Sequence, residues 1–193
     1  MFNHQRTIEN KPKIICLFGN SRCAPGDEEY HQAEQLGRLI AQAGMIVCTG
    51  GYEGIMEAAS RTAQAAGGQT IGITSDIFSS PPNPYLTREI REPDLFSRLK
   101  SIADMGDAFI ALRGGMGTLT EVTLMWNLLV LGCLNPPKPF VLVGACWRPV
   151  VASWSSHLAV DGRDLPHVML VDSAEQAIDY LHSYWQMNHD LAR

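Results

Sequence analysis

Residues 107–123 read DAFIALRGGMGTLTEVT, and this stretch decides the fold class. An apolar run at 107–112 ends in a glycine-rich turn, after which a helical pattern begins at Thr118. An unbroken apolar run is typical of a strand that is buried on both faces, as the strands of parallel sheets are. The stretch therefore predicts a strand, a tight turn and a helix, which together form the repeating unit of α/β proteins.

The same alternation runs through the rest of the chain. Further strands are expected at 13–18, 69–74, 139–144 and 168–172, and a strand with its exit loop at 45–51. Helices are expected at about 30–43, 54–66, 95–104, 118–131, after Pro149 and after Ser173. Residues 76–94 contain four prolines and are expected to form an irregular loop that walls a pocket. The pattern predicts a doubly wound, mainly parallel sheet with helices on both faces, in one domain over residues 1–193 with its core at about 13–184.

Composition limits the partners of the chain. With 193 residues and 46% hydrophobic content, it is large enough to bury one core. The formal net charge is -5 and there is no basic run, which argues against nucleic acid and anionic membrane surfaces as partners. No stretch approaches the roughly 20 apolar residues of a membrane span, and the N-terminus lacks the apolar core of a secretion signal.

Cysteine and histidine usage predicts a reducing compartment and no metal. The five cysteines show no close-pair spacing, and an odd number without a framework favours the cytoplasm. The six histidines are scattered, without the i, i+4 pairs that metal sites use. We therefore expect a cytoplasmic protein without a structural metal.

Three predicted strands end in glycine-bearing loops, at 19–21 (GNS), 49–54 (TGGYEG) and 113–118 (RGGMGT). Ligands of open α/β sheets bind at the carboxyl ends of the strands, so these loops are expected to share one crevice. The amides at 113–118 can point at an anion, at the positive end of a helix dipole. The spacing fits neither Walker A, since the lysine is missing, nor GxGxxG. A phosphate cradle and a plain strand-to-helix turn both remain open.

Two charged residues each allow a structural and a functional interpretation. Thr118 and Glu121 have the spacing of a capping box, in which Glu121 would bond the helix N-terminus; the alternative is a catalytic carboxylate. Arg98 lies off the apolar face of its predicted helix and is either a solvated helix arginine or a functional one.

Two motifs together resemble the LOG (Lonely Guy) family. The family signature PGGxGTxxE appears as RGGMGTLTE at 113–121, and the family's upstream arginine falls on Arg98, nine residues before Asp107. GNSR and TGGYEGIMEAA match as well, and the similarity spans about residues 14–181. The resemblance implies a modified Rossmann-like fold, a homodimer and no cofactor.

LOG proteins are cytokinin-activating nucleoside monophosphate phosphoribohydrolases and their bacterial relatives. The resemblance implies cleavage of the N-glycosidic bond of AMP or of N6-substituted AMP (a cytokinin nucleotide) to free base and ribose 5-phosphate. Arg98 and Glu121 match the family's catalytic pair. The residues that match its nucleotide and phosphate site are Gly19, Ser21, Gly50, Gly51, Met56, Gly114, Gly115, Gly117 and Thr118.

The chain also departs from the family pattern. Arg113 replaces the signature proline, Thr120 replaces an acidic residue, and Lys100 is shifted by one position from the family's Arg-Lys pair. The alternative function is a non-catalytic nucleotide or molybdenum-cofactor carrier, because molybdenum-cofactor carrier proteins resemble LOG proteins in fold and glycine motifs. A lysine decarboxylase, a frequent label for this fold, is disfavoured because none of the four lysines lies in the glycine loops.

Overall fold

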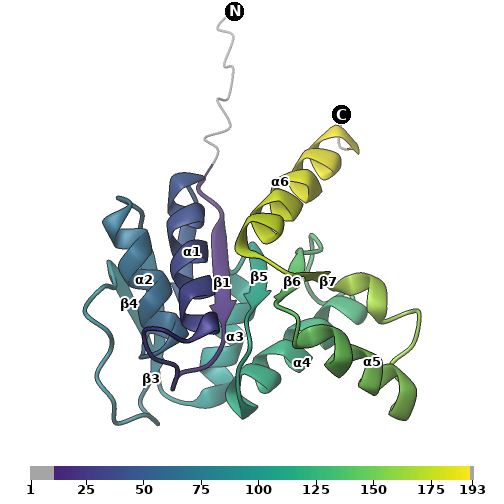
Figure 1. Cartoon of the computed structure of the whole chain (residues 1–193), viewed down its shortest axis with the longest axis horizontal. Coiled ribbons are helices and arrows are strands. Elements are labelled where there is room, and N and C mark those ends of the chain that lie inside the picture. Colours follow the sequence, from purple (N-terminus) through teal and green to yellow (C-terminus); the bar gives the residue numbers. More distant parts are fainter. Residues whose placement is uncertain (1–10, 192–193) are drawn as a thin grey trace, which may run out of the picture.

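The computed structural model describes residues 11–191, which form one parallel sheet of seven strands in the order β4-β3-β2-β1-β5-β6-β7 (Figure 1). The strands are β1 (Ile14–Phe18), β2 (Ile46–Thr49), β3 (Thr70–Ser75), β4 (Arg88–Glu92), β5 (Ala108–Ala111), β6 (Phe140–Val143) and β7 (Met169–Val171). The helices are α1 (Glu28–Gln42), α2 (Ile55–Ala65), α3 (Leu95–Met105), α4 (Met116–Val130), α5 (Trp147–His157) and α6 (Ala174–Leu191), with a 3-10 turn at Leu165–His167.

Helices cover both faces of the sheet, and each face has its own apolar core. Helix α1 packs against α2 and α6 on one face (Figure 1), and α3, α4 and α5 lie on the other. Side chains of β1 alternate between the cores, with Ile15 and Leu17 in the first and Cys16 and Phe18 in the second. Both faces of the strand are buried, which is why its sequence is apolar without a break. The expected doubly wound sheet is confirmed.

The strand order reverses between β1 and β5 at the centre of the sheet. The chain runs outward from β1 through β2 and β3 to β4, and then returns to place β5 on the other side of β1. The two strands pair in parallel from Ile15 opposite Ala108 to Phe18 opposite Ala111, and β1 points to the bottom of Figure 1. Such a reversal opens a crevice at the carboxyl ends of the strands, where ligands of α/β sheets bind.

Three expected elements have different boundaries in the structure. Arg88–Glu92 forms strand β4, so the expectation of an irregular loop over all of residues 76–94 is wrong. This strand is charged and largely exposed because it lies at the sheet edge and pairs only with β3. Helix α4 begins at Met116 rather than at Thr118. Helix α6 continues to Leu191, beyond the expected end of the core at about residue 184.

Candidate functional site

A cavity of about 420 Å³ opens at the carboxyl ends of the strands, next to the reversal between β1 and β5. Its walls come from the loops after β1, β2, β3 and β5 and from helices α2, α3 and α4. The predicted site residues that line it are Gly19, Ser21, Met56, Arg98, Gly115, Gly117, Thr118 and Glu121. The fold thus brings the glycine loops to one place, and the volume suits a small-molecule ligand.

Three predicted site residues, Gly50, Gly51 and Gly114, do not line the cavity. A Cβ at Gly50 would overlap the Nη2 atom of Arg98, and one at Gly114 would overlap the hydroxyl of Thr118. Gly51 adopts a φ of +82°, which favours glycine. These glycines make room for the side chains and the turn that form the wall.

Arg98 is buried in the cavity wall, with 7% of its surface exposed. Its Nε donates a hydrogen bond to the carbonyl oxygen of Ile73 at 2.7 Å, and its guanidinium lies 5.6 Å from the centre of the Phe78 ring. Asp94 caps α3 by accepting hydrogen bonds from two first-turn amides, which fixes the start of the helix that carries Arg98. The interpretation of Arg98 as a solvated helix arginine is therefore wrong.

Glu121 faces Arg98 from α4, with 3.7 Å between its Oε1 and the arginine Nη1 and with 12% of its side chain exposed. Burial raises the pKa of Glu121 from its usual 4.5 to about 7, and the positive charge of Arg98 opposes this shift. A carboxyl group that titrates near neutral pH is suited to proton transfer.

The capping-box interpretation of Glu121 is wrong. The N-cap of α4 is Gly115, which provides no side-chain cap, so the helix starts before Thr118 and Glu121 lies in its second turn. From there the carboxylate is too far along the helix to bond the first amides. Its side chain is instead directed at Arg98.

Arg113, which stands where the signature has proline, does not line the cavity. Its Nη1 lies 3.6 Å from a carboxylate oxygen of Glu29 on α1. The backbone carbonyl of Arg113 accepts a hydrogen bond from the Asn20 amide at 3.1 Å, and the Asn20 side chain donates to Glu29 at 3.3 Å. These three residues tie the loops after β1 and β5 together across the reversal.

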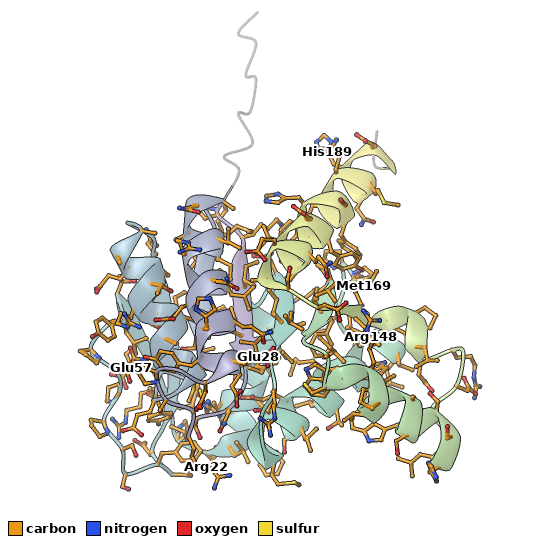
Figure 2. The ribbon with its side chains drawn as sticks, viewed as in Figure 1. Arg22, Glu28, Glu57, Arg148, Met169 and His189 are labelled. Carbon is orange, nitrogen blue, oxygen red and sulfur yellow. The ribbon has the colours of Figure 1, made fainter. Side chains whose placement is uncertain are left out.

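Several side chains of the cavity carry no sequence signal of their own. Arg22 follows the GNS motif and lies at the lower edge of the molecule in Figure 2, with its amide held by the Asn20 side chain at 3.0 Å. Tyr52 lies inside the TGGYEG motif, and Phe78 comes from the loop after β3. The remaining lining residues outside the prediction are Asn20, Glu53, Ser80 and Met116. Proximity to a glycine motif is the signal for most of these residues, but Phe78 and Ser80 have none.

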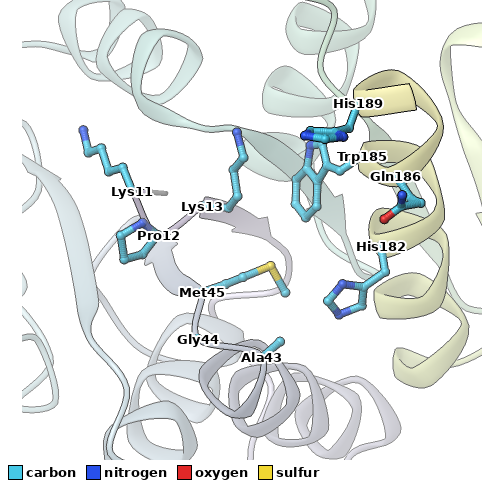
Figure 3. Close-up of a pocket in the computed structure, with 10 residues that line it drawn as sticks. All are labelled: Lys11, Pro12, Lys13, Ala43, Gly44, Met45, His182, Trp185, Gln186 and His189. Atoms are coloured by element: carbon cyan, nitrogen blue, oxygen red, sulfur yellow. The ribbon is translucent and has the colours of Figure 1, made fainter. Parts of the chain in front are cut away.

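A larger cavity of about 840 Å³ lies at the opposite end of the sheet, between the start of β1 and helix α6 (Figure 3). It is lined by residues such as Lys13, Met45 and Trp185 and by none of the predicted site residues. Only the smaller cavity combines the glycine loops with a buried pair of opposite charges, so we assign the candidate site to it.

Within residues 11–191, no three side chains of His, Cys, Asp or Glu are grouped so that they could hold a metal ion. In the same part of the chain, no helix has the length and apolar character needed to cross a bilayer.

The model of the SLOG cluster4 family matches residues 12–132, a range that contains every predicted site residue. The chain belongs to the SLOG cluster4 family. This finding and the sequence relatives of the chain confirm its resemblance to LOG proteins.

Those relatives include named enzymes. This chain is 32% identical to the cytokinin riboside 5'-monophosphate phosphoribohydrolase of Rhodococcoides fascians, over 78% of each protein. It is 33% identical to the protein of the same name from Mycobacterium tuberculosis, over 76% of this chain and 81% of the relative. The pyrimidine/purine nucleotide 5'-monophosphate nucleosidase of Escherichia coli K12 is 29% identical, but the match covers 85% of this chain and 39% of that longer protein.

Solved structures with the same fold include carrier proteins. The molybdenum cofactor binding protein of Rippkaea orientalis has a TM-score of 0.72 and 27% identity to this chain. The match covers 91% of this chain and 98% of the Rippkaea protein. The molybdenum cofactor carrier protein of Chlamydomonas reinhardtii has a TM-score of 0.68 and 25% identity, over 90% of this chain and 98% of the carrier protein. These similarities confirm the Rossmann-like fold of this chain.

Proposed function

We propose that the chain is a nucleoside 5'-monophosphate phosphoribohydrolase that cleaves the N-glycosidic bond of AMP or N6-substituted AMP. The products are the free base and ribose 5-phosphate. The observation that carries the proposal is the buried pair of Arg98 and Glu121 in the cavity at the strand reversal. Relatives named phosphoribohydrolase, at about a third identity over most of their length, support it.

Glu121 is the proposed catalytic carboxylate. Cleavage of a glycosidic bond develops positive charge on the sugar ring, which a nearby carboxylate stabilises. As a general base, Glu121 takes a proton from water while the water oxygen bonds to C1′. The bond between C1′ and the base nitrogen breaks, its electron pair goes to the base, and the base takes up a proton. Arg98 binds the ribose phosphate and holds it in a fixed position relative to the carboxylate.

The proposed phosphate site is the start of α4. The first-turn amides of Met116, Gly117 and Thr118 have no side-chain cap at Gly115, and the helix dipole favours an anion there. Arg22 adds a positive charge, since its Nη2 lies 4.0 Å from where a Cβ of Gly115 would stand. Gly19, Ser21 and Met56 line the same cavity and contact the rest of the nucleotide under this proposal.

Incubation with AMP, followed by chromatography for adenine and ribose 5-phosphate, tests the proposal. A panel of other nucleoside monophosphates, including N6-substituted AMP, defines the preferred base. E121Q is the matched control, because it keeps the shape of the side chain but cannot act as a base. Turnover that persists at near-normal rate in E121Q contradicts the catalytic role of Glu121.

The alternative is a carrier for a nucleotide or for the molybdenum cofactor. The solved molybdenum-cofactor proteins of the same fold support it. We favour the enzyme because binding alone does not require a buried carboxyl that titrates near pH 7 beside an arginine. Absence of turnover across the nucleotide panel, together with measurable binding of the cofactor, favours the carrier.

We further infer a cytoplasmic homodimer with a single domain per chain. Phe96 on α3 and Leu131 at the end of α4 leave 83% and 64% of their surfaces exposed, and large exposed apolar side chains are typical of contact surfaces. All five cysteines are free, which suits a reducing compartment. Light scattering on the purified protein measures the mass directly, and a monomer contradicts the dimer.

A further inference from the structure

Phe78 lines the cavity with part of its side chain exposed. Its ring packs edge-on against Tyr52 with 5.2 Å between ring centres, and it lies over the guanidinium of Arg98 at 5.6 Å. Even with these two neighbours, 41% of the residue is exposed, and it lines the cavity. Two sides of the ring are therefore supported by protein while part of it remains open to a ligand.

The support behind Phe78 is rigid. The Tyr52 hydroxyl accepts a hydrogen bond from the Ser75 amide at 2.9 Å and donates one to the Ser75 carbonyl at 3.1 Å, so the tyrosine ring is fixed in a buried position. Asn83 donates to the carbonyls of Gly51 and Tyr52 at 2.8 and 3.0 Å, which binds the long loop to the TGGYEG turn. The Phe78 amide donates to Ser75 at 3.2 Å. An aromatic side chain on such a scaffold is pre-organised for stacking.

The cavity wall contains two chemically different parts in addition to the charged pair. One part is the start of α4, whose N-cap residue provides no side-chain cap, together with the guanidinium of Arg22. The other part is the aromatic pair of Phe78 and Tyr52. Arg98 contacts both Phe78 and Glu121, so the charged pair adjoins the aromatic part. A nucleotide carries the three groups that these parts suit: an anionic phosphate, a sugar with the glycosidic bond, and a flat base.

We propose that Phe78 is the specificity-determining residue that stacks on the base of the bound nucleotide. The inference rests on the proposed function only in taking a nucleoside monophosphate as the ligand. Stacking recognises the flat face of a base and tolerates changes at its edge. Phe78 therefore favours purines over pyrimidines, through their larger face, and admits purines that carry a substituent at N6.

The test measures binding without turnover. In the E121Q background, calorimetry compares the Kd of AMP with the Kd of ribose 5-phosphate, which has the phosphate and the sugar but no base. F78L keeps an apolar side chain without an aromatic face, and F78A removes both. We expect AMP to bind about tenfold more weakly to both variants, as loss of one base stack implies, and ribose 5-phosphate to bind unchanged. I77A is the matched control, because Ile77 is the next residue on the same loop, is 52% exposed and does not line the cavity.

Two outcomes overturn the inference. Unchanged AMP binding in F78A shows that the base does not stack on this ring. An equal loss for AMP and ribose 5-phosphate shows that Phe78 acts by holding Arg98 in place. The proposed function fails separately: if AMP binding depends on Phe78 but the protein with Glu121 releases no adenine, the stacking role stands and the hydrolase does not.

Discussion

The guanidinium of Arg98 lies 3.7 Å from the carboxylate of Glu121, and both side chains are almost wholly buried, at 8% and 12% exposure. They come from different helices, α3 and α4, and meet in the wall of the cavity. Burying a charged group without a partner is costly, so each residue makes the burial of the other possible. The incomplete compensation leaves the pKa of Glu121 at about 7, and four predictions follow from this arrangement and its surroundings.

The activity should depend on the ionisation of Glu121. Below pH 7 the carboxyl is protonated and cannot act as a base, so kcat/KM for AMP should rise with pH and level off above about pH 7. The folded protein also holds this proton more tightly than the unfolded chain, where the carboxyl titrates near 4.5. Its contribution to the free energy of unfolding should therefore fall as pH rises from about 4.5 to 7.

Rate profiles from pH 5 to 9 and urea unfolding at the same pH values measure both effects. E121Q has no titrating group at this position and should flatten this part of the stability profile. A rate that is constant between pH 5 and 9 excludes Glu121 as the base.

Replacing Arg98 should shift the pH profile. R98M removes the positive charge that lowers the pKa of Glu121, so the midpoint of the rate profile should move to higher pH. R98K keeps the charge but loses the planar fork and the Nε hydrogen bond to Ile73, so it should reduce kcat by tenfold or more with a smaller shift of the midpoint. Steady-state kinetics across pH separates the two; identical midpoints in wild type and R98M contradict the electrostatic coupling.

Arg22 should contribute to binding and little to the chemical step. R22Q removes a positive charge from the proposed phosphate site, so KM for AMP should rise roughly tenfold while kcat stays within about twofold. R113Q is the matched control, because Arg113 pairs with Glu29 and does not line the cavity. Equal effects of R22Q and R113Q on KM would indicate a general loss of positive charge rather than a phosphate contact.

Replacing Gly50 with alanine should reduce activity, because the added methyl group would displace the side chain of Arg98. In G50A the new Cβ would overlap the Nη2 atom of Arg98 and come within 2.8 Å of the Met56 sulfur, so the guanidinium must move. We expect kcat/KM to fall by at least tenfold while circular dichroism remains that of the wild type. G162A is the control, since nothing lies within 4 Å of a Cβ at that position. Wild-type activity in G50A means that Arg98 can shift without consequence.

The sequence by itself determined the class of fold and the location of the site. Apolar runs such as residues 14–18 identify strands because strands of a parallel sheet are buried on both faces. Glycines after these strands mark the carboxyl edge, where α/β proteins bind ligands. These signals are local, so they can be read without knowing which strands are neighbours.

The tertiary structure alone decided the environment of the charged residues. REIRE at 88–92 looks like a loop because its charges are those of an exposed segment, and only its pairing with β3 makes it a strand. Arg98 lies off the apolar face of its own helix, and it is buried because Ile73, Phe78 and Glu121 meet it from three other segments. The spacing of Thr118 and Glu121 predicted a helix cap, but α4 starts earlier than this spacing implied, and Glu121 pairs with Arg98 instead. Burial and pKa depend on neighbours that are distant in sequence, and the fold is what brings those neighbours together.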